Sequence, residues 1–501
     1  MKLKSSDPRG LALAGCALLI LTMPLCGATY YVATNGVDSN PGTLAAPFYN
    51  ISKATALAAA GDFILVRGGT FYYTNTIRIT NSGAAGNLIR LWAYTNEHPT
   101  LDFSAQADDP ANRAFLVTSN GNWWHFKGLE IYRAGDNAMK IEGSDNIIEQ
   151  CAFHHCRDSG LQIGFGDSDP DFPDRACSNL VLNCDSYLNY DPRASGGNAD
   201  GFACKLHPGE GNVFRGCRSW ENSDDGWDLY KAAYQIILED CWTWHNGDPA
   251  SFSTNQAGNA GGFKMGGDSN YAGHHLFYRC IAFNNRYGGT SAGKAFHQND
   301  NQAGLMVFNC LSFSNNYNYA LNNDIAESHE MKNCVGFAGI TKNAATNSST
   351  IQVSNSWNFT AASLTASAAD YGDLTEATAK SGRGADGSLP ANFARLVAGS
   401  DLIDRGVDVG FPFNGARPDL GPFEFAAAAR SLTLSAPQKL PGGFSFQIGG
   451  LTSHGSVIVR ISTNLVNWSP LLTNAPVTGA LPVLDSSATN SSSRFYRVEE
   501  L

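Results

Sequence analysis

Residues 214–222 read FRGCRSWEN, and variants of this string recur along the middle of the chain. The related strings are VLNCDSYLN (181–189), LEDCWTWHN (238–246), FYRCIAFNN (277–285) and VFNCLSFSN (307–315). In each string an aromatic residue follows the cysteine by three positions and an asparagine follows it by five. The interval between copies varies, as expected when a constant strand-and-bend unit is joined by turns of different length. The repeat therefore predicts a solenoid of stacked coils.

Three residue types recur at fixed places in these strings, so each should stack on its own kind. The cysteines are predicted to form a file of buried thiols, which pack as small apolar groups: Cys151, Cys184, Cys217, Cys241, Cys280, Cys310 and Cys334. The asparagines are predicted to form a ladder whose amides bond one another at a backbone bend: Asn189, Asn222, Asn246, Asn285 and Asn315. The aromatic residues are predicted to fill the interior: Tyr187, Trp220, Trp244, Phe283, Phe313 and Phe337. Cys156 and Cys177 are the one pair considered for a disulfide.

A second set of strings follows the asparagine bends: DNAMKI (136–141), DSGLQI (158–163), DGFACKL (200–206), DGWDLY (225–230) and GGFKMG (261–266). Side chains alternate between the two faces of a strand. The residues predicted to point inward are Met139, Leu161, Phe202, Trp227 and Phe263. Those predicted to share one outer face are Lys140, Gln162, Ala203, Asp228 and Lys264.

The ends of the chain differ in character from the repeats. Lys2 and Lys4 precede the apolar run 11–25, so residues 1–28 are interpreted as an export signal and the protein as secreted, to the periplasm or the medium. Residues 29–425 are predicted to form the solenoid, with a capping helix at 51–60 and a closing turn and last strand at 415–425. A linker at 426–430 and a small β-sandwich of unknown role at 431–501 follow. No segment is apolar enough for a membrane span.

Composition narrows the classes of function. Charged residues make up 16% of the chain and glycine numbers 52, which favours many short strands and tight turns over helices. The formal net charge of −11 argues against general binding of nucleic acid.

Four carboxylates fall close together in the predicted register: Asp200, Asp224, Asp225 and Asp228. Without a cation they would repel one another, whereas calcium takes six to eight oxygen ligands. Asp-Gly is also ordinary turn chemistry, so Asp200 and Asp225 could serve only to shape bends. A role limited to shaping a turn is less plausible for Asp224 and Asp228, since the turn needs no acidic residue at either position.

Lys264 occupies the outward position one coil beyond Asp228. It is either one half of a surface salt bridge, which contributes little, or a general base whose pKa a nearby divalent cation would lower. Four further basic residues could contact substrate carboxylates or simply lie in solvent: Lys205, His207, Lys294 and His297.

Residues 198–230, NADGFACKLHPGEGNVFRGCRSWENSDDGWDLY, followed by GGFKMGG at 261–267, resemble the active-site region of polysaccharide lyase family nine. The resemblance covers about residues 29–425 and implies a right-handed parallel β-helix. It also implies that Asp200, Asp224, Asp225 and Asp228 hold a catalytic Ca2+ and that Lys264 abstracts the proton. The segment 431–501 lies outside the resemblance.

The chain is thus expected to be a secreted, monomeric lyase that cleaves pectate, an acidic polysaccharide, by calcium-dependent β-elimination. A glycoside hydrolase that uses Asp224 and Asp228 as acid and base is one alternative. A lyase of another uronate polymer, such as rhamnogalacturonan or alginate, is a second. A non-catalytic β-helix that binds glycans is a third.

Overall fold

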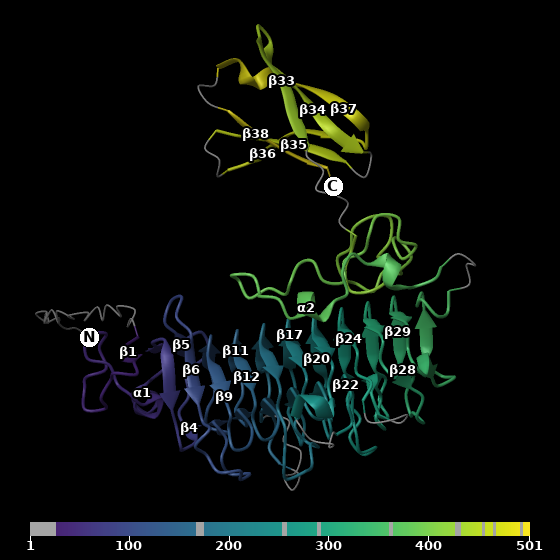
Figure 1. Ribbon diagram of the computed structural model, residues 1–501. Coiled ribbons are helices and arrows are strands. Elements are labelled where there is room, and N and C mark those ends of the chain that lie inside the picture. The colour runs from purple at the N-terminus through teal and green to yellow at the C-terminus, as the bar shows by residue number, and fades with distance from the viewer. Residues whose placement is uncertain are drawn as a thin grey trace, which may run out of the picture.

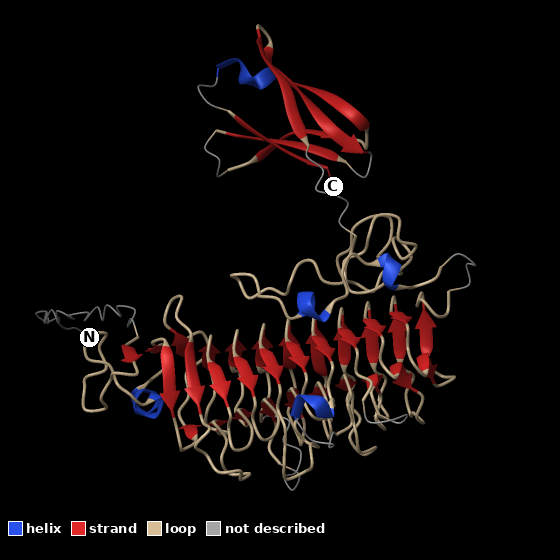
Figure 2. Ribbon diagram, viewed as in Figure 1, coloured by secondary structure: helices blue, strands red, loops and turns tan. Residues whose placement is uncertain are grey.

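The computed structural model describes residues 27–500, apart from 167–174, 253–257, 288–291, 360–363, 426–431, 453–455, 464–466 and 491–493. Short strands alternate among three long sheets, here called A, B and C, and their neighbours pair in parallel. Successive strands of one sheet belong to successive turns of the chain, so the coils stack side by side (Figure 1 and Figure 2). This is a parallel β-helix, which confirms the solenoid. The export signal predicted at 1–28 lies almost wholly outside the described residues.

Sheet A contains β1 (Thr29–Val32), β2 (Phe63–Val66), β5 (Ile89–Ala93), β8 (Trp124–Lys127), β11 (Ile147–Glu149), β14 (Leu180–Leu182), β17 (Asn212–Arg215), β20 (Ile236–Glu239), β23 (Leu276–Tyr278), β26 (Met306–Phe308), β29 (Glu330–Lys332) and β32 (Ile351–Val353). Sheet B contains β3 (Gly69–Tyr72), β6 (Pro99–Asp102), β9 (Glu130–Tyr132), β12 (Ala152–His154), β15 (Asp185–Tyr187), β18 (Arg218–Trp220), β21 (Trp242–Trp244), β24 (Ile281–Phe283), β27 (Leu311–Phe313) and β30 (Val335–Phe337). Sheet C contains β4 (Ile77–Ile79), β7 (Phe115–Val117), β10 (Met139–Ile141), β13 (Leu161–Ile163), β16 (Phe202–Cys204), β19 (Trp227–Asp228), β22 (Phe263–Lys264), β25 (Lys294–His297), β28 (Tyr317–Leu321) and β31 (Lys342–Thr346).

In the described part of the chain, helices are few and short. They are α1 (Ile51–Leu57), α2 (Glu376–Ala379) and the 3-10 turns Pro249–Phe252, Ala368–Asp370 and Ser486–Asn490. Helix α1 packs on β1, β2 and β4 with Ile51 and Ala54 buried in the core. It lies at the N-terminal end of the solenoid and ends at Leu57, three residues short of the predicted 51–60. Its role as a cap over the open strand edges stays a prediction.

The asparagine ladder and the cysteine file are both present. Each ladder amide donates to the carboxamide oxygen of the next asparagine, from Asn189 to Asn222 at 2.9 Å through to Asn285 and Asn315 at 3.0 Å. A second ladder, which the sequence analysis missed, joins Asn146, Asn179 and Asn212 at 3.1 Å per step. The seven cysteines of the file are buried free thiols, and Cys156 and Cys177 are free thiols as well, so the disulfide considered for them does not form.

Removing one rung of the ladder should destabilise the fold. Asn246 is fully buried, and its amide donates to Asn285 and to Thr243, so Asn246→Ala leaves buried partners without hydrogen bonds. We expect the free energy of unfolding to fall by about 1–3 kcal/mol, measured by chemical denaturation. Asn87→Ala, at an exposed position, is the control and should change it by less than about 0.5 kcal/mol.

The aromatic file faces outward from sheet B, so its predicted interior position was wrong. Its rings stack almost parallel, with centroids 4.5 Å apart between Tyr187 and Trp220 and 5.1 Å apart between Trp220 and Trp244. The inward positions of the same strands hold small residues such as Ser186 and Thr243. The chain after β32 returns over this face and buries the file (Figure 1), with Phe393 packed on Trp242 and Phe283 among its contacts.

The segment 415–425 belongs to this covering layer. It contains no strand, contrary to the prediction of a closing strand, and consists of turns that place Leu420 in the same hydrophobic cluster. The solenoid instead ends with β31 and β32, which are the last strands of sheets C and A.

The C-terminal residues form two small antiparallel sheets. One contains β33 (Thr433–Leu440), β34 (Gly443–Thr452) and β37 (Thr478–Asp485), and the other contains β35 (Val457–Ser462), β36 (Ser469–Asn474) and β38 (Phe495–Glu500). Ile448, Val457 and Val459 are buried between them. The arrangement agrees with the predicted small β-sandwich, whereas the boundaries proposed at 425 and 431 stay predictions.

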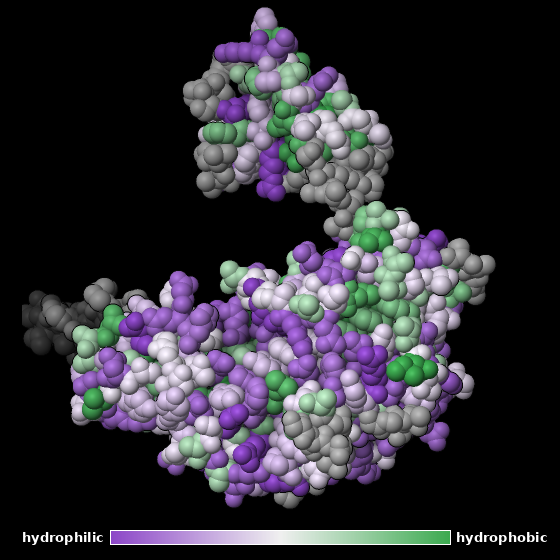
Figure 3. All heavy atoms as spheres, viewed as in Figure 1, coloured by the Kyte–Doolittle hydropathy of each residue, from purple (hydrophilic) through white to green (hydrophobic). Residues whose placement is uncertain are grey.

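The surface of the solenoid is largely hydrophilic on the side seen in Figure 3. Within the described part of the chain, no helix combines the length and apolar character that a membrane crossing requires.

Candidate metal and active site

The outer face of sheet C carries the predicted row of polar side chains. Strand register pairs Lys140 with Gln162, Ala203 with Asp228, and Asp228 with Lys264 on neighbouring coils. The alternate residues, from Met139 to Phe263, are fully buried in the core. Both halves of the predicted alternation are therefore confirmed.

Three of the four predicted carboxylates converge on this face. Asp200 and Asp225 stand two residues before β16 and β19, and Asp228 ends β19. One carboxylate oxygen of each lies within 4.8 Å of an oxygen of the other two, and all three side chains are buried. Oδ2 of Asp225 is buried without a hydrogen-bond donor.

The glycines that follow Asp200 and Asp225 are needed for close packing. A Cβ atom at Gly201 would lie 2.0 Å from Oγ of Ser219, and one at Gly226 would lie 2.0 Å from Oγ1 of Thr243. The backbone can therefore approach the asparagine ladder only without a side chain at these positions. Because the same approach recurs on successive coils, Asp200 and Asp225 occupy equivalent positions, and the amide of Gly201 donates to the carbonyl of Asp225 at 3.0 Å.

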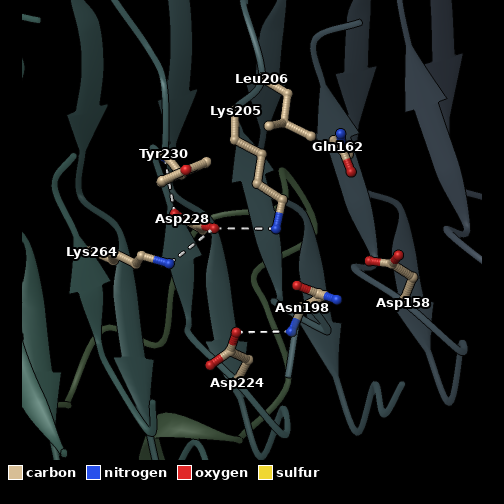
Figure 4. Close-up of a pocket in the computed structure, with 9 residues that line it drawn as sticks. All are labelled: Asp158, Gln162, Asn198, Lys205, Leu206, Asp224, Asp228, Tyr230 and Lys264. Carbon is tan, nitrogen blue, oxygen red and sulfur yellow. Dashed lines mark hydrogen bonds and ion pairs between the residues drawn. The ribbon is translucent and has the colours of Figure 1, made fainter. Parts of the chain in front are cut away.

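Asp224 lies in the same pocket but is oriented differently. Its Oδ2 accepts from the backbone amide of Asn198 at 2.9 Å (Figure 4). Its Oδ1 accepts from the backbone amide of Asn259. Its oxygens do not belong to the group of three that lie within 4.8 Å of one another. Sequence spacing alone could not separate Asp224 from its neighbour Asp225.

Two glycines admit these carboxylates into the wall of the site. A Cβ atom at Gly258 would lie 2.1 Å from Oδ1 of Asp224, and one at Gly261 would lie 2.2 Å from Oδ1 of Asp225. The amide of Gly261 also donates to that Asp225 oxygen at 3.0 Å. Gly261 therefore leaves space for a carboxylate, a role that the sequence analysis did not assign to it.

Gly261→Ala should displace the Asp225 carboxylate, because the added methyl group would overlap Oδ1. We expect the affinity for Ca2+ to fall by about tenfold or more, measured by calorimetry. Gly382→Ala is the matched control, since a Cβ atom at Gly382 meets no atom within 4 Å. Equal calcium affinities of the two variants would contradict the packing role of Gly261.

Two lysines reach into the carboxylate cluster. Nζ of Lys264 lies 3.3 Å from Asp228 and 3.5 Å from Asp225. Nζ of Lys205 lies 2.6 Å from Asp200 and 3.2 Å from Asp228. The sequence analysis considered Lys205 as a contact for substrate carboxylates or as a solvated residue, not as a partner of the clustered aspartates. It missed that the chain turns after β16 and brings this side chain back over the strand end.

The cluster is electrostatically crowded. Burial raises the pKa of Asp200 to about 7, and the charges of Asp228 and Asp224 act in the same direction against Lys205 and Lys264. Burial and the neighbouring Asp224 also raise the pKa of Asp225 well above its ordinary value. Burial lowers the pKa of Lys264, but Asp228 and Asp225 outweigh it, so that the net shift is upward. A bound cation would relieve the repulsion among the carboxylates.

A cavity of about 450 Å³ opens over the cluster. The residues around it are drawn in Figure 4 and include Gln162, Asn198 and Tyr230, none of which was singled out as a site residue. Tyr230 lies beside the base candidate, with Nζ of Lys264 5.7 Å from the ring centroid. His207, a possible substrate contact, is instead buried against the ring of Tyr271. The other two candidates, Lys294 and His297, lie on β25.

The residues present fit a hard divalent cation. The three clustered side chains offer only carboxylate oxygens, which calcium and magnesium prefer over the nitrogen and sulfur ligands typical of zinc. Oδ2 of Asp225 accepts no hydrogen bond and has only a contact of 3.5 Å with Nζ of Lys264, so it is available to bind a cation. Calcium suits such a flexible set of oxygen donors.

Comparisons with known proteins agree with the parallel β-helix fold. Residues 30–333 match the family described as the Pel9A-like, right-handed β-helix region. Pectate lyase L of Dickeya chrysanthemi is 37% identical over 79% of this chain and 90% of its own. Pectate lyase L of Paenibacillus polymyxa is 38% identical over 77% of this chain and 85% of its own.

Two solved structures are similar in fold as well as in sequence. The crystal structure of pectate lyase Pel9A superposes with a TM-score of 0.70 at 37% identity, covering 80% of this chain and 96% of that one. A rhamnogalacturonan lyase superposes with a TM-score of 0.60 at 25% identity, covering 74% of this chain and 97% of that one.

Proposed function

This chain belongs to the family of Pel9A-like right-handed β-helix proteins and is a lyase of the pectate lyase type, and from that premise we propose that it cleaves pectate by calcium-assisted β-elimination with Lys264 as the base. The observation that carries the proposal is the position of Lys264. Its amine lies within 3.5 Å of Asp225 and Asp228, two of three carboxylates that share one oxygen cluster under an open cavity. A base thus stands beside the place where a cation would hold the substrate carboxylate.

Asp200, Asp225 and Asp228 would hold the calcium ion, with Asp224 at the edge of the set. When bound, the ion draws electrons from the C6 carboxylate of a galacturonate and so acidifies the neighbouring C5–H bond. The neutral amine of Lys264 takes the C5 proton. The electron pair of the C5–H bond forms the C4–C5 double bond, and the C4–O bond breaks. The departing sugar keeps the oxygen and gains a proton from solvent.

The hydrolase alternative is less consistent with the site. An inverting or retaining hydrolase needs a second carboxyl group free to protonate the leaving oxygen. Both oxygens of Asp224, the proposed partner of Asp228, are already directed at backbone amides. Lys264 supplies a base once its amine is neutral, and proton abstraction at carbon requires such a base whereas the acid–base pair of a hydrolase does not.

The substrate is the part of the proposal that needs a direct experiment. Wild-type protein with calcium should release products with a conjugated double bond from polygalacturonate, followed by ultraviolet absorbance. Rhamnogalacturonan and alginate are the comparison polymers, the first because a rhamnogalacturonan lyase shares the fold at 25% identity. Faster double-bond formation on either would reassign the substrate. New reducing ends without a double bond would favour a hydrolase. Binding of the polymer without any cleavage would favour a non-catalytic protein.

We propose further that the protein is secreted through the signal at 1–28 and that catalysis belongs to residues 29–425. All the clustered carboxylates and both lysines lie between positions 200 and 264. The C-terminal sheets supply none of them.

A further inference from the structure

The outer face of sheet C carries a second basic group next to Lys264. His297 on β25 is the register partner of Lys264, so the two side chains lie on the same face of adjacent coils. Nζ of Lys294, on the same strand, lies 3.1 Å from Nε2 of His297. The two residues form a dyad one coil further from the carboxylate cluster than Lys264.

In this pair Lys294 carries the positive charge and His297 is neutral. Burial, together with the charges of Lys294 and Lys264, lowers the pKa of His297 to about 3, so the ring is neutral at ordinary pH. A neutral ring with Nε2 facing an ammonium group accepts its hydrogen bond, which leaves the proton on Nδ1. His297 therefore fixes the direction of the Lys294 side chain without neutralising it.

No carboxylate in the described part of the chain forms an ion pair with Lys294. Other lysines of this protein are paired, as Lys332 is with Glu330 at 2.6 Å and Lys127 with Glu149 at 2.6 Å. Lys294 is half-buried, which costs hydration, and the charge of Asp300 offsets part of that cost without forming an ion pair with it. Burial lowers the pKa of Lys294, and an anion bound beside it would act in the opposite direction.

We propose that Lys294, held by His297, binds the carboxylate of the sugar next to the one that Lys264 deprotonates. The inference rests on the proposed lyase function. Strands of a sheet lie about 4.8 Å apart, so a polymer that crosses the coils presents successive sugars to successive positions of the row. Asp228 and its neighbours would hold one uronate through the cation. One coil beyond Lys264 the next uronate would meet Lys294 directly, which makes this position selective for a second acidic sugar.

Lys294→Gln tests the proposal through the split between KM and kcat. We expect KM for polygalacturonate to rise about tenfold or more and kcat to change less than about twofold, because the lost contact is made to a sugar that does not react. Lys332→Gln is the control with the same loss of charge, since Lys332 lies on sheet A and its pair is only a surface one. Lys294→Arg keeps the cation and should stay near the wild-type KM.

A polymer with fewer carboxylates distinguishes a specific contact between Lys294 and one carboxylate from nonspecific electrostatic attraction between the protein and the polymer. Partial methyl esterification of the polymer should narrow the difference between wild type and Lys294→Gln, because neighbouring carboxylates are then often absent. Equal KM values for Lys294→Gln and Lys332→Gln would overturn the role of Lys294, as would a kcat loss with unchanged KM.

Binding provides a second readout that does not depend on turnover. In a Lys264→Ala background with calcium, Lys294→Gln should weaken the binding of tetragalacturonate by about tenfold, measured by calorimetry, and should flatten its salt dependence. A wild-type protein that fails to cleave polygalacturonate would refute the lyase proposal itself. Active wild type with unchanged binding in the Lys294 variant would refute only this inference.

Discussion

Lys264→Ala should lower turnover on polygalacturonate by about a hundredfold or more, which is within the usual effect of removing a general base. Calcium binding should survive, because Asp200, Asp225 and Asp228 stay in place. The variant also removes the Lys264 ammonium group, which would compete with calcium for Asp225 and Asp228. The measurement is the initial rate of ultraviolet absorbance under saturating calcium, with calorimetry on the same preparation.

Lys264→Arg distinguishes the base from a salt bridge. Arginine keeps the charge beside Asp225 and Asp228 but stays protonated at any working pH, so it cannot accept the proton. If Lys264 is the base, the arginine variant should be about as inactive as the alanine variant. If Lys264 serves only as an ion pair, the arginine variant should approach wild type, and the proposed lyase would then be without its base.

The pH dependence follows from the same chemistry. Only the neutral amine can act, and the carboxylates around Lys264 hold its pKa above the ordinary value. Activity should therefore rise with pH toward the alkaline range. A cation bound to Asp225 and Asp228 opposes that upward shift, so calcium should move the rising limb of the profile to lower pH.

The positions of the catalytic candidates were predictable because a solenoid has a strict register. Once Met139, Leu161 and Phe202 were assigned to the interior, strand alternation placed Asp228 and Lys264 on one outer face. What spacing could not supply was the direction of individual side chains. Asp224 turns toward backbone amides, and Lys205, the first residue after β16, turns back to Asp200.

The aromatic file illustrates a second limit. Hydrophobic residues at a fixed repeat position were assigned to the interior, yet the inward position on sheet B belongs to small residues such as Ser186, whose hydroxyl donates to the carbonyl of Gly201. The outward rings are buried by residues more than a hundred positions away, such as Phe393 packed on Phe283. The segment that covers these rings is distant in sequence and does not repeat, so the repeated strings alone could not predict that the rings face outward.

Removing calcium should abolish lyase activity and should also change how stability depends on pH. In the metal-free protein, burial raises the pKa of Asp200 from 3.8 to about 7, so the folded state binds a proton that the unfolded state has released. The free energy of unfolding should therefore decrease as pH rises from about 4 to about 7. Calcium held at the proposed site would bind only the ionised carboxylates of the folded state. Its addition should reverse that decrease and raise the midpoint of thermal unfolding in a concentration-dependent way.

Asp225→Asn tests the same site without a chelator. The change keeps the shape of the side chain but removes one ligand charge, and Oδ2 of Asp225 is the cluster oxygen that lacks a hydrogen-bond donor. Outer-shell changes at metal sites commonly cost about 10–100-fold in affinity, so loss of a direct ligand should cost at least tenfold. Activity should then fall at low calcium and recover in part at high calcium. Asp109→Asn, at an exposed turn, is the matched control and should leave calcium affinity unchanged. Full activity of wild type in excess chelator, with no metal retained by the protein, would exclude the cation from the mechanism and leave Lys264 to act without it.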